Sequence, residues 1–334
     1  MNTKPFIRAL IAGLAFSAST VAGSLHKEAV SADAKWLIHL DVDAFRMTQL
    51  GMFVGKQILD PKLAKPKADL KEQANFDFDW RRITSLTAYG TEFQPQPKGV
   101  LLLTTDMNVQ AALDAVLAKQ ALGGAEGPIK RLESAPLPLY ALNNDLFMAL
   151  QPGKPVVISK SREEALKARA VLAGQSPNLL ASRAFTEFPP PPKAFFFLTA
   201  AEGFNEVAPI PASARVLKMA DSLRLVLGES GDQVFVNLAL KAKTPEVSQQ
   251  IQQVIQGMLA LLALSQVDNP DLNQFAQSTK VTVSDKMVTV DLHFPVAKTV
   301  KKIEEDERIK GSHAGGESPP SPPSAPSDSD AGAK

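Results

Sequence analysis

The sequence predicts an α+β fold made of two tandem copies of one unit, each an antiparallel sheet with helices packed on one face. Three observations support this prediction: strand pairs joined by tight turns, amphipathic helices after those pairs, and the same order of elements in both halves of the chain. Hairpins beside helices are typical of α+β layers. The chain has 334 residues, a length that fits about two domains.

The chain begins with a segment typical of a secretory signal peptide. Residues 1–23 contain Lys4 and Arg8, then a short apolar run from Ala9 to Ser19, then small residues. This is the order of a positive region, an apolar core and a cleavage site. An N-terminal membrane anchor is the alternative, but it needs ~20 apolar residues, about twice the length of this run. We therefore expect a periplasmic or secreted protein with no transmembrane segment after cleavage.

The first copy, residues 32–188, opens with WLIHLDVDAF, which reads as a strand followed by a helix. His39, Asp41 and Asp43 occupy alternate positions, and alternate side chains of a strand share a face. One interpretation is a site for a divalent ion or for proton transfer.

The interpretation that we favour for this stretch is a scaffold. Trp36, Ile38 and Leu40 would face the core, and the histidine and first aspartate would face outward. Asp43 would cap the helix that continues to Ile58. The corresponding stretch of the second copy, AFFFLTA, has none of the three polar residues.

The rest of the first copy predicts two hairpin–helix blocks after a lysine-rich insertion. Strands at 84–92 and 98–107 precede a helix at 108–120, for which Asn108 is a candidate N-cap. A second hairpin turns at Pro152–Gly153, and the next helix has the capping box Ser161 and Glu164.

Pro189–Pro192 favour a stiff polyproline II rod, and we interpret residues 189–193 as the join to the second copy, residues 194–310. Strands at 221–230 and 233–242 form a hairpin, and Thr244 and Pro245 begin a helix. A last hairpin turns at Asp285–Lys286 and leads into a final helix. The apolar stripe of the helix after Thr244 comprises Val247, Ile251, Val254, Ile255, Met258 and Leu262.

The elements of the two halves correspond at a nearly constant offset. Leu86 matches Leu223, Val100 matches Val234 and Val156 matches Val288. The order and spacing of elements, and not residue identity, therefore predict an internal repeat. The sequence leaves open whether the copies form one continuous sheet or two packed layers.

The C-terminal segment, residues 311–334, is built mainly from Gly, Ser, Pro, Ala and Asp. It lacks the apolar residues that offset the entropy of ordering a chain, so we expect a disordered tail.

The composition argues against several classes of function. The net charge is +1, which provides no general attraction for nucleic acid. The absence of cysteine excludes disulfides, thiolate metal sites and a cysteine nucleophile. The glycine-rich run 121–128 has no phosphate-loop Lys-Ser/Thr, and no common serine-hydrolase motif is present. We predict no catalytic residue, cofactor or metal site.

The remaining histidines, one aromatic run and a lysine cluster are other candidates for a functional role. The remaining histidines, His26, His293 and His313, show no ligand spacing. The run AFFFL at 194–198 is best read as a fully buried strand, with a hydrophobic ligand pocket as the alternative. A cluster of four lysines is a solvated face or a contact site for an acidic surface such as anionic lipid: Lys62, Lys65, Lys67 and Lys71.

The signal peptide, the start ADAKWLIHLDVDAF and the terminal block VTVDLHFPVAKTVKKIEE resemble exported bacterial proteins that have no assigned activity. The resemblance covers most of residues 32–309 and rests on core patterns, so it implies no functional residue.

Three hypotheses about function remain. The first is an exported, non-catalytic binding or structural protein of the bacterial envelope, whose partner is a protein or another envelope component. The second is a periplasmic hydrolase with a site assembled between the two halves. The third is a carrier of lipid or other hydrophobic ligands, which requires an apolar cavity of roughly several hundred Å³.

Overall fold

The computed structural model describes residues 25–93, 99–122, 127–133, 137–143, 145–204, 212–265 and 275–314. The predicted signal peptide lies outside these residues, as does most of the predicted tail. The last helix runs to Ala314 and so overlaps the first four residues of the predicted tail, whose boundary stays a prediction.

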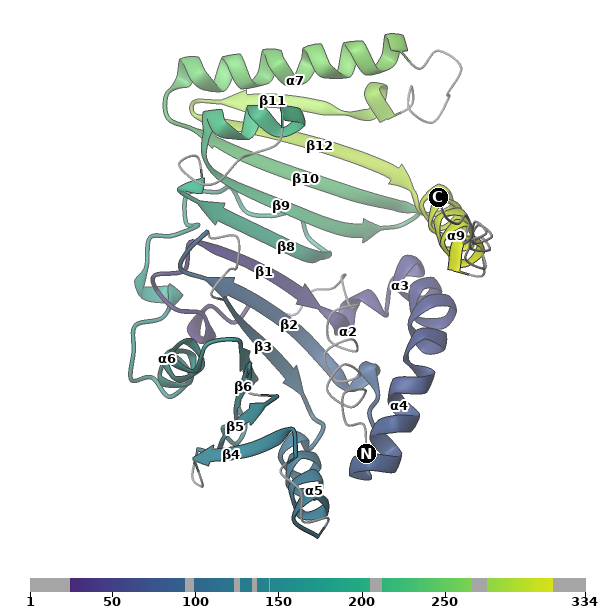
Figure 1. Cartoon of the computed structure of the whole chain (residues 1–334). Helices are drawn as coiled ribbons and strands as arrows, with labels where there is room; N and C mark the ends of the chain where they lie inside the picture. Colours follow the sequence, from purple (N-terminus) through teal and green to yellow (C-terminus); the bar gives the residue numbers. More distant parts are fainter. Residues whose placement is uncertain are drawn as a thin grey trace, which may run out of the picture.

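One continuous antiparallel sheet contains all twelve strands that these residues form, in the order β11-β12-β10-β9-β8-β1-β2-β3-β7-β6-β5-β4. Figure 1 shows it as a twisted surface that runs the length of the molecule. The α+β prediction is confirmed, and the open question of one sheet or two layers is answered. The strands are β1 (Trp36–Asp41), β2 (Ile83–Gly90), β3 (Gly99–Thr105), β4 (Ile129–Glu133), β5 (Leu139–Leu142), β6 (Leu146–Ala149), β7 (Val156–Ser159), β8 (Phe195–Glu202), β9 (Ala220–Ser230), β10 (Gln233–Ala242), β11 (Lys280–Ser284) and β12 (Met287–Pro295).

The helices follow the strand pairs, as the sequence predicts. The α-helices are α2 (Val42–Phe45), α3 (Gln49–Val54), α4 (Asp60–Ala74), α5 (Val109–Leu122), α6 (Arg162–Leu172), α7 (Pro245–Ser265) and α9 (Val296–Ala314). Short 3-10 segments are η1 (Lys27–Ala29), η3 (Trp80–Arg82), η4 (Leu179–Ala181) and η6 (Ala212–Met219), and η2 (Gly55–Leu59) is a π-helical segment.

The two halves of the sheet have the same strand order, except that the first has two additional strands, β4 and β5. The first half reads β1-β2-β3-β7-β6 and the second reads β8-β9-β10-β12-β11. They join where β1 pairs with β8, from Trp36 opposite Ala201 to Leu40 opposite Phe197. Strand order alone does not establish common descent, so the duplication and its domain boundaries stay predictions.

Helices cover both faces of the sheet in the first half, which differs from the predicted single face. Leu103 and Ile158 pack with α4 and α5, whereas Leu102 and Val157 pack on the opposite side with α6 and η1. The reason is that β3 and β7 carry consecutive apolar residues, so each face needs a cover. In the second half, α7 and α9 pack on the same side as α4 and α5.

The lysine-rich insertion of the first copy is helical. Helices α3 and α4 run on through η2, with Pro61 in the first turn of α4 and Pro66 inside it. Pro61 is tolerated because the first N–H groups of a helix have no intrahelical acceptor. Asn75, with φ of 48°, ends α4 in the left-handed conformation.

Helix α7 buries a narrower stripe than the sequence predicts. Ile251 is fully buried, but Val254 and Met258 are 42% and 51% exposed, and Leu261 is 67% exposed. Helix α7 lies beside β11 at one end of the sheet (Figure 1), so only one side of it has a sheet to cover.

Replacing Met258 and Leu261 together by glutamine should therefore leave the free energy of unfolding within about 0.5 kcal/mol of the wild type. Both side chains are exposed, so no cavity forms. Ile251→Ala, on the buried side of the same helix, should cost about 3 kcal/mol. Urea denaturation of the three proteins measures the contrast, and a loss above 2 kcal/mol in the double variant would show that the exposed stripe is covered in solution.

Candidate functional site

The polar residues of the first strand are buried, contrary to the predicted outward orientation of their side chains. His39 and Asp41 are 1% and 2% exposed, and Ile38, which was expected in the core, is 40% exposed. Leu37 lies on the face that α6 and η1 cover, and His39 and Asp41 share that face by alternation. Because helices pack on both sides of the sheet here, the row of polar side chains that includes His39 and Asp41 is buried.

Asp41, and not Asp43, caps helix α2. An oxygen of the Asp41 carboxyl group accepts the backbone N–H of Asp43 at 2.9 Å and that of Ala44 at 3.4 Å. The other oxygen, Oδ2, is buried without a hydrogen-bond partner. Burial raises the pKa of Asp41 to about 7, against the opposing effect of the two backbone donors.

The neighbouring strands continue this polar row. His39 Nδ1 lies 2.8 Å from Thr87 Oγ1 on β2, and Ser85 Oγ lies 3.0 Å from Thr104 Oγ1 on β3. Asp41 stands opposite Ser85 in the strand register. In the part of the chain that the structure describes, no group of three or more His, Cys, Asp or Glu side chains is placed to hold a metal ion.

The other histidines belong to other parts of the fold. His26 is exposed, with Nδ1 2.9 Å from Glu28 Oε1. His293 is exposed on β12. His313 falls within α9, where its side chain is not described.

The lysine cluster and the two apolar or glycine-rich runs also have a place in the fold. The four lysines are exposed on α4, where Lys62 Nζ lies 2.5 Å from Glu307 Oε2 of α9 and Lys67 Nζ lies 4.0 Å from Asp77 Oδ1. Residues 123–126 of the glycine-rich run lie outside the described ranges. Residues 195–198 of the run at 194–198 form the first half of β8. The side chains there alternate between half-buried and buried, so the run is less buried than predicted.

A surface pocket opens where β3 and β7 stop pairing. The ladder between them ends at Leu103 opposite Val156. The next residue of the β7 side is Pro155, which has no N–H to donate to a ladder, and the chain then turns away at Gly153 with φ of 68°. The strands separate at this point and leave a pocket of about 330 Å³ beside the start of α5.

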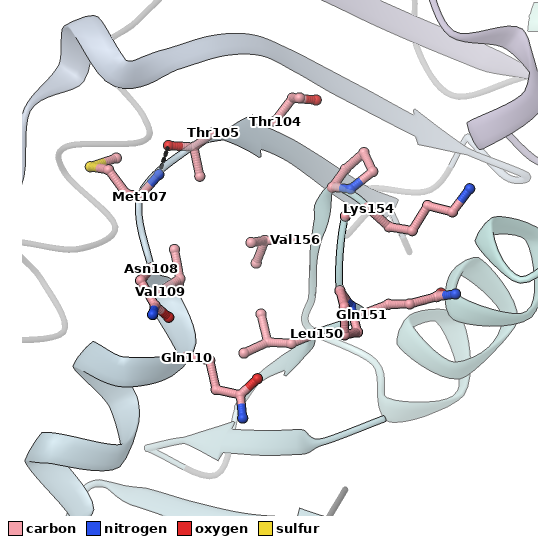
Figure 2. Close-up of a pocket in the computed structure, with 13 residues that line it drawn as sticks. Thr104, Thr105, Met107, Asn108, Val109, Gln110, Leu150, Gln151, Lys154 and Val156 are labelled. Carbon is pink, nitrogen blue, oxygen red and sulfur yellow. Dashed lines mark hydrogen bonds between the residues drawn. The ribbon is translucent and has the colours of Figure 1, made fainter. Parts of the chain in front are cut away.

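Neutral side chains surround the centre of this pocket. Figure 2 shows Thr105, Val109, Gln110, Leu150 and Val156 around it. None of the described residues that line it carries a carboxylate or an imidazole. The complete lining is Thr104, Thr105, Met107, Asn108, Val109, Gln110, Leu150, Gln151, Pro152, Gly153, Lys154, Pro155 and Val156.

The one cation of the lining, Lys154, extends away from the pocket centre in Figure 2. It also lines a second pocket of about 250 Å³, together with His26 and Glu28. The loop 151–155 thus separates a neutral pocket from a charged one. We name the neutral one the β3–β7 pocket.

Two polar residues that line the β3–β7 pocket make structural hydrogen bonds. Asn108 Oδ1 accepts the backbone N–H of Ala111 at 3.0 Å and caps α5, as predicted. Thr105 Oγ1 accepts the backbone N–H of Met107 at 3.1 Å, the contact dashed in Figure 2. Gln110 is exposed beside them. Its amide is therefore accessible to a ligand in the pocket.

The described interior also contains a small, wholly apolar cavity between α4, α5 and the sheet. Its volume is about 30 Å³, which is room for about one water molecule. Leu70, Phe78, Leu113 and Met148 line part of it.

These residues define an α+β protein with one antiparallel sheet and a neutral surface pocket at the end of a strand pair. No helix in the described ranges has both the length and the apolar content needed to cross a membrane.

Neither a protein-family model nor a curated protein matches the sequence. Among solved structures, crystal form III of TP0453 is 11% identical with a TM-score of 0.47, and the match covers 86% of this chain and 99% of that one. Crystal form I of TP0453 is 12% identical with a TM-score of 0.46, covering 85% and 98% of the two chains. The resemblance to exported bacterial proteins stays a prediction.

Proposed function

We propose that this chain is an exported, non-catalytic binding protein of the bacterial envelope, and that its β3–β7 pocket holds an uncharged stretch of a partner protein. The observation that supports this proposal most directly is the lining of the pocket. Amide, hydroxyl and apolar side chains at the end of a strand pair match the main chain of an extended peptide, which offers N–H and C=O groups and small apolar side chains.

The chemistry of the pocket favours binding over turnover. General acid–base catalysis needs a titratable group within hydrogen-bond reach of the substrate, and the thirteen described lining residues place none but Lys154 there, which extends away from the centre. Asp41 has a shifted pKa, but it is buried and does not line the β3–β7 pocket. Strand pairing, and not an open cleft, joins the two halves.

The described interior gives no support to the carrier hypothesis. A lipid chain needs several hundred Å³, on the order of a ligand pocket, and the apolar cavity measures about 30 Å³.

A blocking substitution tests the pocket. Gln110→Trp should fill it and weaken peptide binding at least tenfold, because the indole takes the space of the ligand. Ala115→Trp is the matched control, since Ala115 is exposed on the same helix and does not line the pocket. The probe is a peptide selected from a random library of 15-residue peptides on the wild-type protein, and titration calorimetry gives its dissociation constant for each variant.

Two results would contradict the pocket assignment: selection that yields no binding peptide, or a selected peptide that binds the Gln110→Trp variant as tightly as the control. Export is tested separately. The mass of the chain recovered from the periplasmic fraction should correspond to loss of a segment near residues 1–23, and a full-length mass would contradict export with cleavage.

A further inference from the structure

The side of the second half that lacks helices carries a row of buried polar groups. Arg224 on β9 and Asn237 on β10 are 5% and 6% exposed. Arg224 Nη2 donates to Asn237 Oδ1 at 2.9 Å, and Asn237 Nδ2 donates to Asp291 Oδ1 on β12 at 2.7 Å. The apolar pattern of β9 does not reveal this row, because its leucines alternate with Ser222 and Arg224 and are the more exposed set.

A proline-rich segment, residues 185–193, lies across this row, and we name it the proline strap. Arg224 Nη1 donates to the carbonyl oxygen of Pro189, and the Arg224 guanidinium lies 5.6 Å from the ring centroid of Phe188. Glu187 pairs with Lys241 of β10. The predicted join between halves is thus bound to the sheet.

The contact with Pro189 shows how this face recognises proline-rich chain. A polyproline II segment makes no internal hydrogen bonds, so its carbonyl oxygens accept from side-chain donors. Arg224 already supplies one such donor, and its Nε is buried without an acceptor. Two residues have left-handed backbones: Phe185, the first residue of the strap, with φ of 60°, and Ala194, directly after the strap, with φ of 61°. This conformation costs energy in residues other than glycine, so it needs contacts that compensate.

A pocket of about 330 Å³ continues the strap at its C-terminal end. Pro192 and Lys193 form one side, and Phe235 and His293 belong to β10 and β12. Val236, Ser230 and Asp291 complete the lining. Aromatic side chains beside a proline are typical of grooves that take proline-rich segments.

The chain supplies such a segment itself. Residues 317–330 read ESPPSPPSAPSDSD, with five prolines, three carboxylates and no cation. Lys193 places a positive charge at the pocket, beside the carboxylate of Asp291. The proline content therefore favours this segment as an occupant, and its carboxylates are possible partners for Lys193.

The chain between β12 and this C-terminal segment is long enough for the segment to reach the pocket. Helix α9 starts at Val296, three residues after His293 of the pocket. Its 19 residues span about 28 Å. An extended proline-rich chain rises about 3.1 Å per residue, so roughly nine residues after Ala314 bring the chain back to the pocket. Pro323 and Pro326 lie at or beyond that point.

We propose that the pocket at the end of the proline strap binds the protein's own proline-rich C-terminal segment, with residues around Pro323–Pro326 beside Phe235 and His293. This interaction is independent of the β3–β7 pocket, which lies in the first half of the sheet.

Disulfide formation in the full-length chain tests the proposal without background, because the sequence contains no cysteine. In the variant Ser230→Cys with Ser324→Cys, mild oxidation should form an intramolecular disulfide at least tenfold faster than in the control Met47→Cys with Ser324→Cys. Met47 is 80% exposed, so a cysteine there is accessible. It lies near the same end of the sheet as Ser230, because its neighbour Gln49 donates a hydrogen bond to Asp232. It is on the opposite side of the sheet from the pocket, which makes it a control for proximity alone.

Replacing Pro319, Pro320, Pro322, Pro323 and Pro326 by alanine in the Ser230→Cys, Ser324→Cys chain should reduce the rate to that of the control. Equal rates in the two cysteine pairs would overturn the proposal. A covalent dimer in place of the intramolecular disulfide would assign the pocket to a second copy, and an unchanged rate in the alanine variant would show that the prolines are not recognised.

Discussion

Phe196→Ala should lower the free energy of unfolding by about 4 kcal/mol, the range for loss of a buried aromatic side chain. Phe196 is 2% exposed on β8, next to the junction of the two halves, and its ring meets that of Phe45 edge-on at 5.8 Å. Val234 and Val296 complete the cluster. The substitution would therefore leave a cavity between β8, α2 and α9, because these elements collapse only partly into the space.

Urea denaturation followed by tryptophan fluorescence measures this effect. Both tryptophans, Trp36 and Trp80, belong to the first half. A lower urea midpoint of the fluorescence transition would therefore show that the substitution in β8 also destabilises the first half. Phe196→Leu is the matched control and should cost about 1–2 kcal/mol. Leu180→Ala, at a residue that is 67% exposed, should change little. Similar losses for the alanine and leucine variants of Phe196 would contradict tight packing at the junction.

Asp41 should make the protein less stable as the pH rises from about 4 to about 7. Its pKa in the folded protein is about 7, above the ordinary value of 3.8, so folding favours the protonated carboxyl group. Stability from this group is complete below the unfolded pKa and is lost as the pH passes through the folded pKa. A pKa difference of about three units between the folded and unfolded states corresponds to a loss of as much as about 4 kcal/mol in the free energy of unfolding.

The comparison with Asp41→Asn isolates this effect from that of the other carboxylates. Asparagine keeps the oxygen that caps α2 and remains a good N-cap, but it does not ionise. Chemical denaturation at several pH values should therefore show that the free energy of unfolding of the variant rises relative to that of the wild type as the pH rises. The two values should cross between pH 4 and pH 7. A constant difference across that range would show that Asp41 is already ionised in the folded protein at low pH.

Local patterns in the sequence were sufficient for the hairpins and most helices. The β9–β10 and β11–β12 pairs form as predicted. Ser161 Oγ accepts the backbone N–H of Glu164 at 3.3 Å, and Thr244 Oγ1 accepts that of Val247 at 3.3 Å, so both predicted caps are present. These features depend on residues within a few positions of each other, and alternation or helical spacing therefore reveals them.

The orientation of β1 could not be obtained in this way. Its alternation of Trp36, Ile38 and Leu40 with His39 and Asp41 suggests one apolar and one polar face. The cover over the polar face comes from η1 and α6, and α6 follows more than a hundred residues later. The two pockets could not be predicted for the same reason. Gln110 and Val156 line one pocket, and Lys193 and His293 line the other, although each pair is far apart in the sequence. The pairing of the strands brings them together.

The pairing of β1 with β8 has a consequence for how each half could exist alone. Each of these strands is the outermost strand of its own half, and the other half covers it. A half produced separately would present a bare strand edge, which readily recruits another strand. If the chain did arise by duplication, its single-unit ancestor had the same edge to close, and the simplest solution was a homodimer in which two copies of that strand paired with each other.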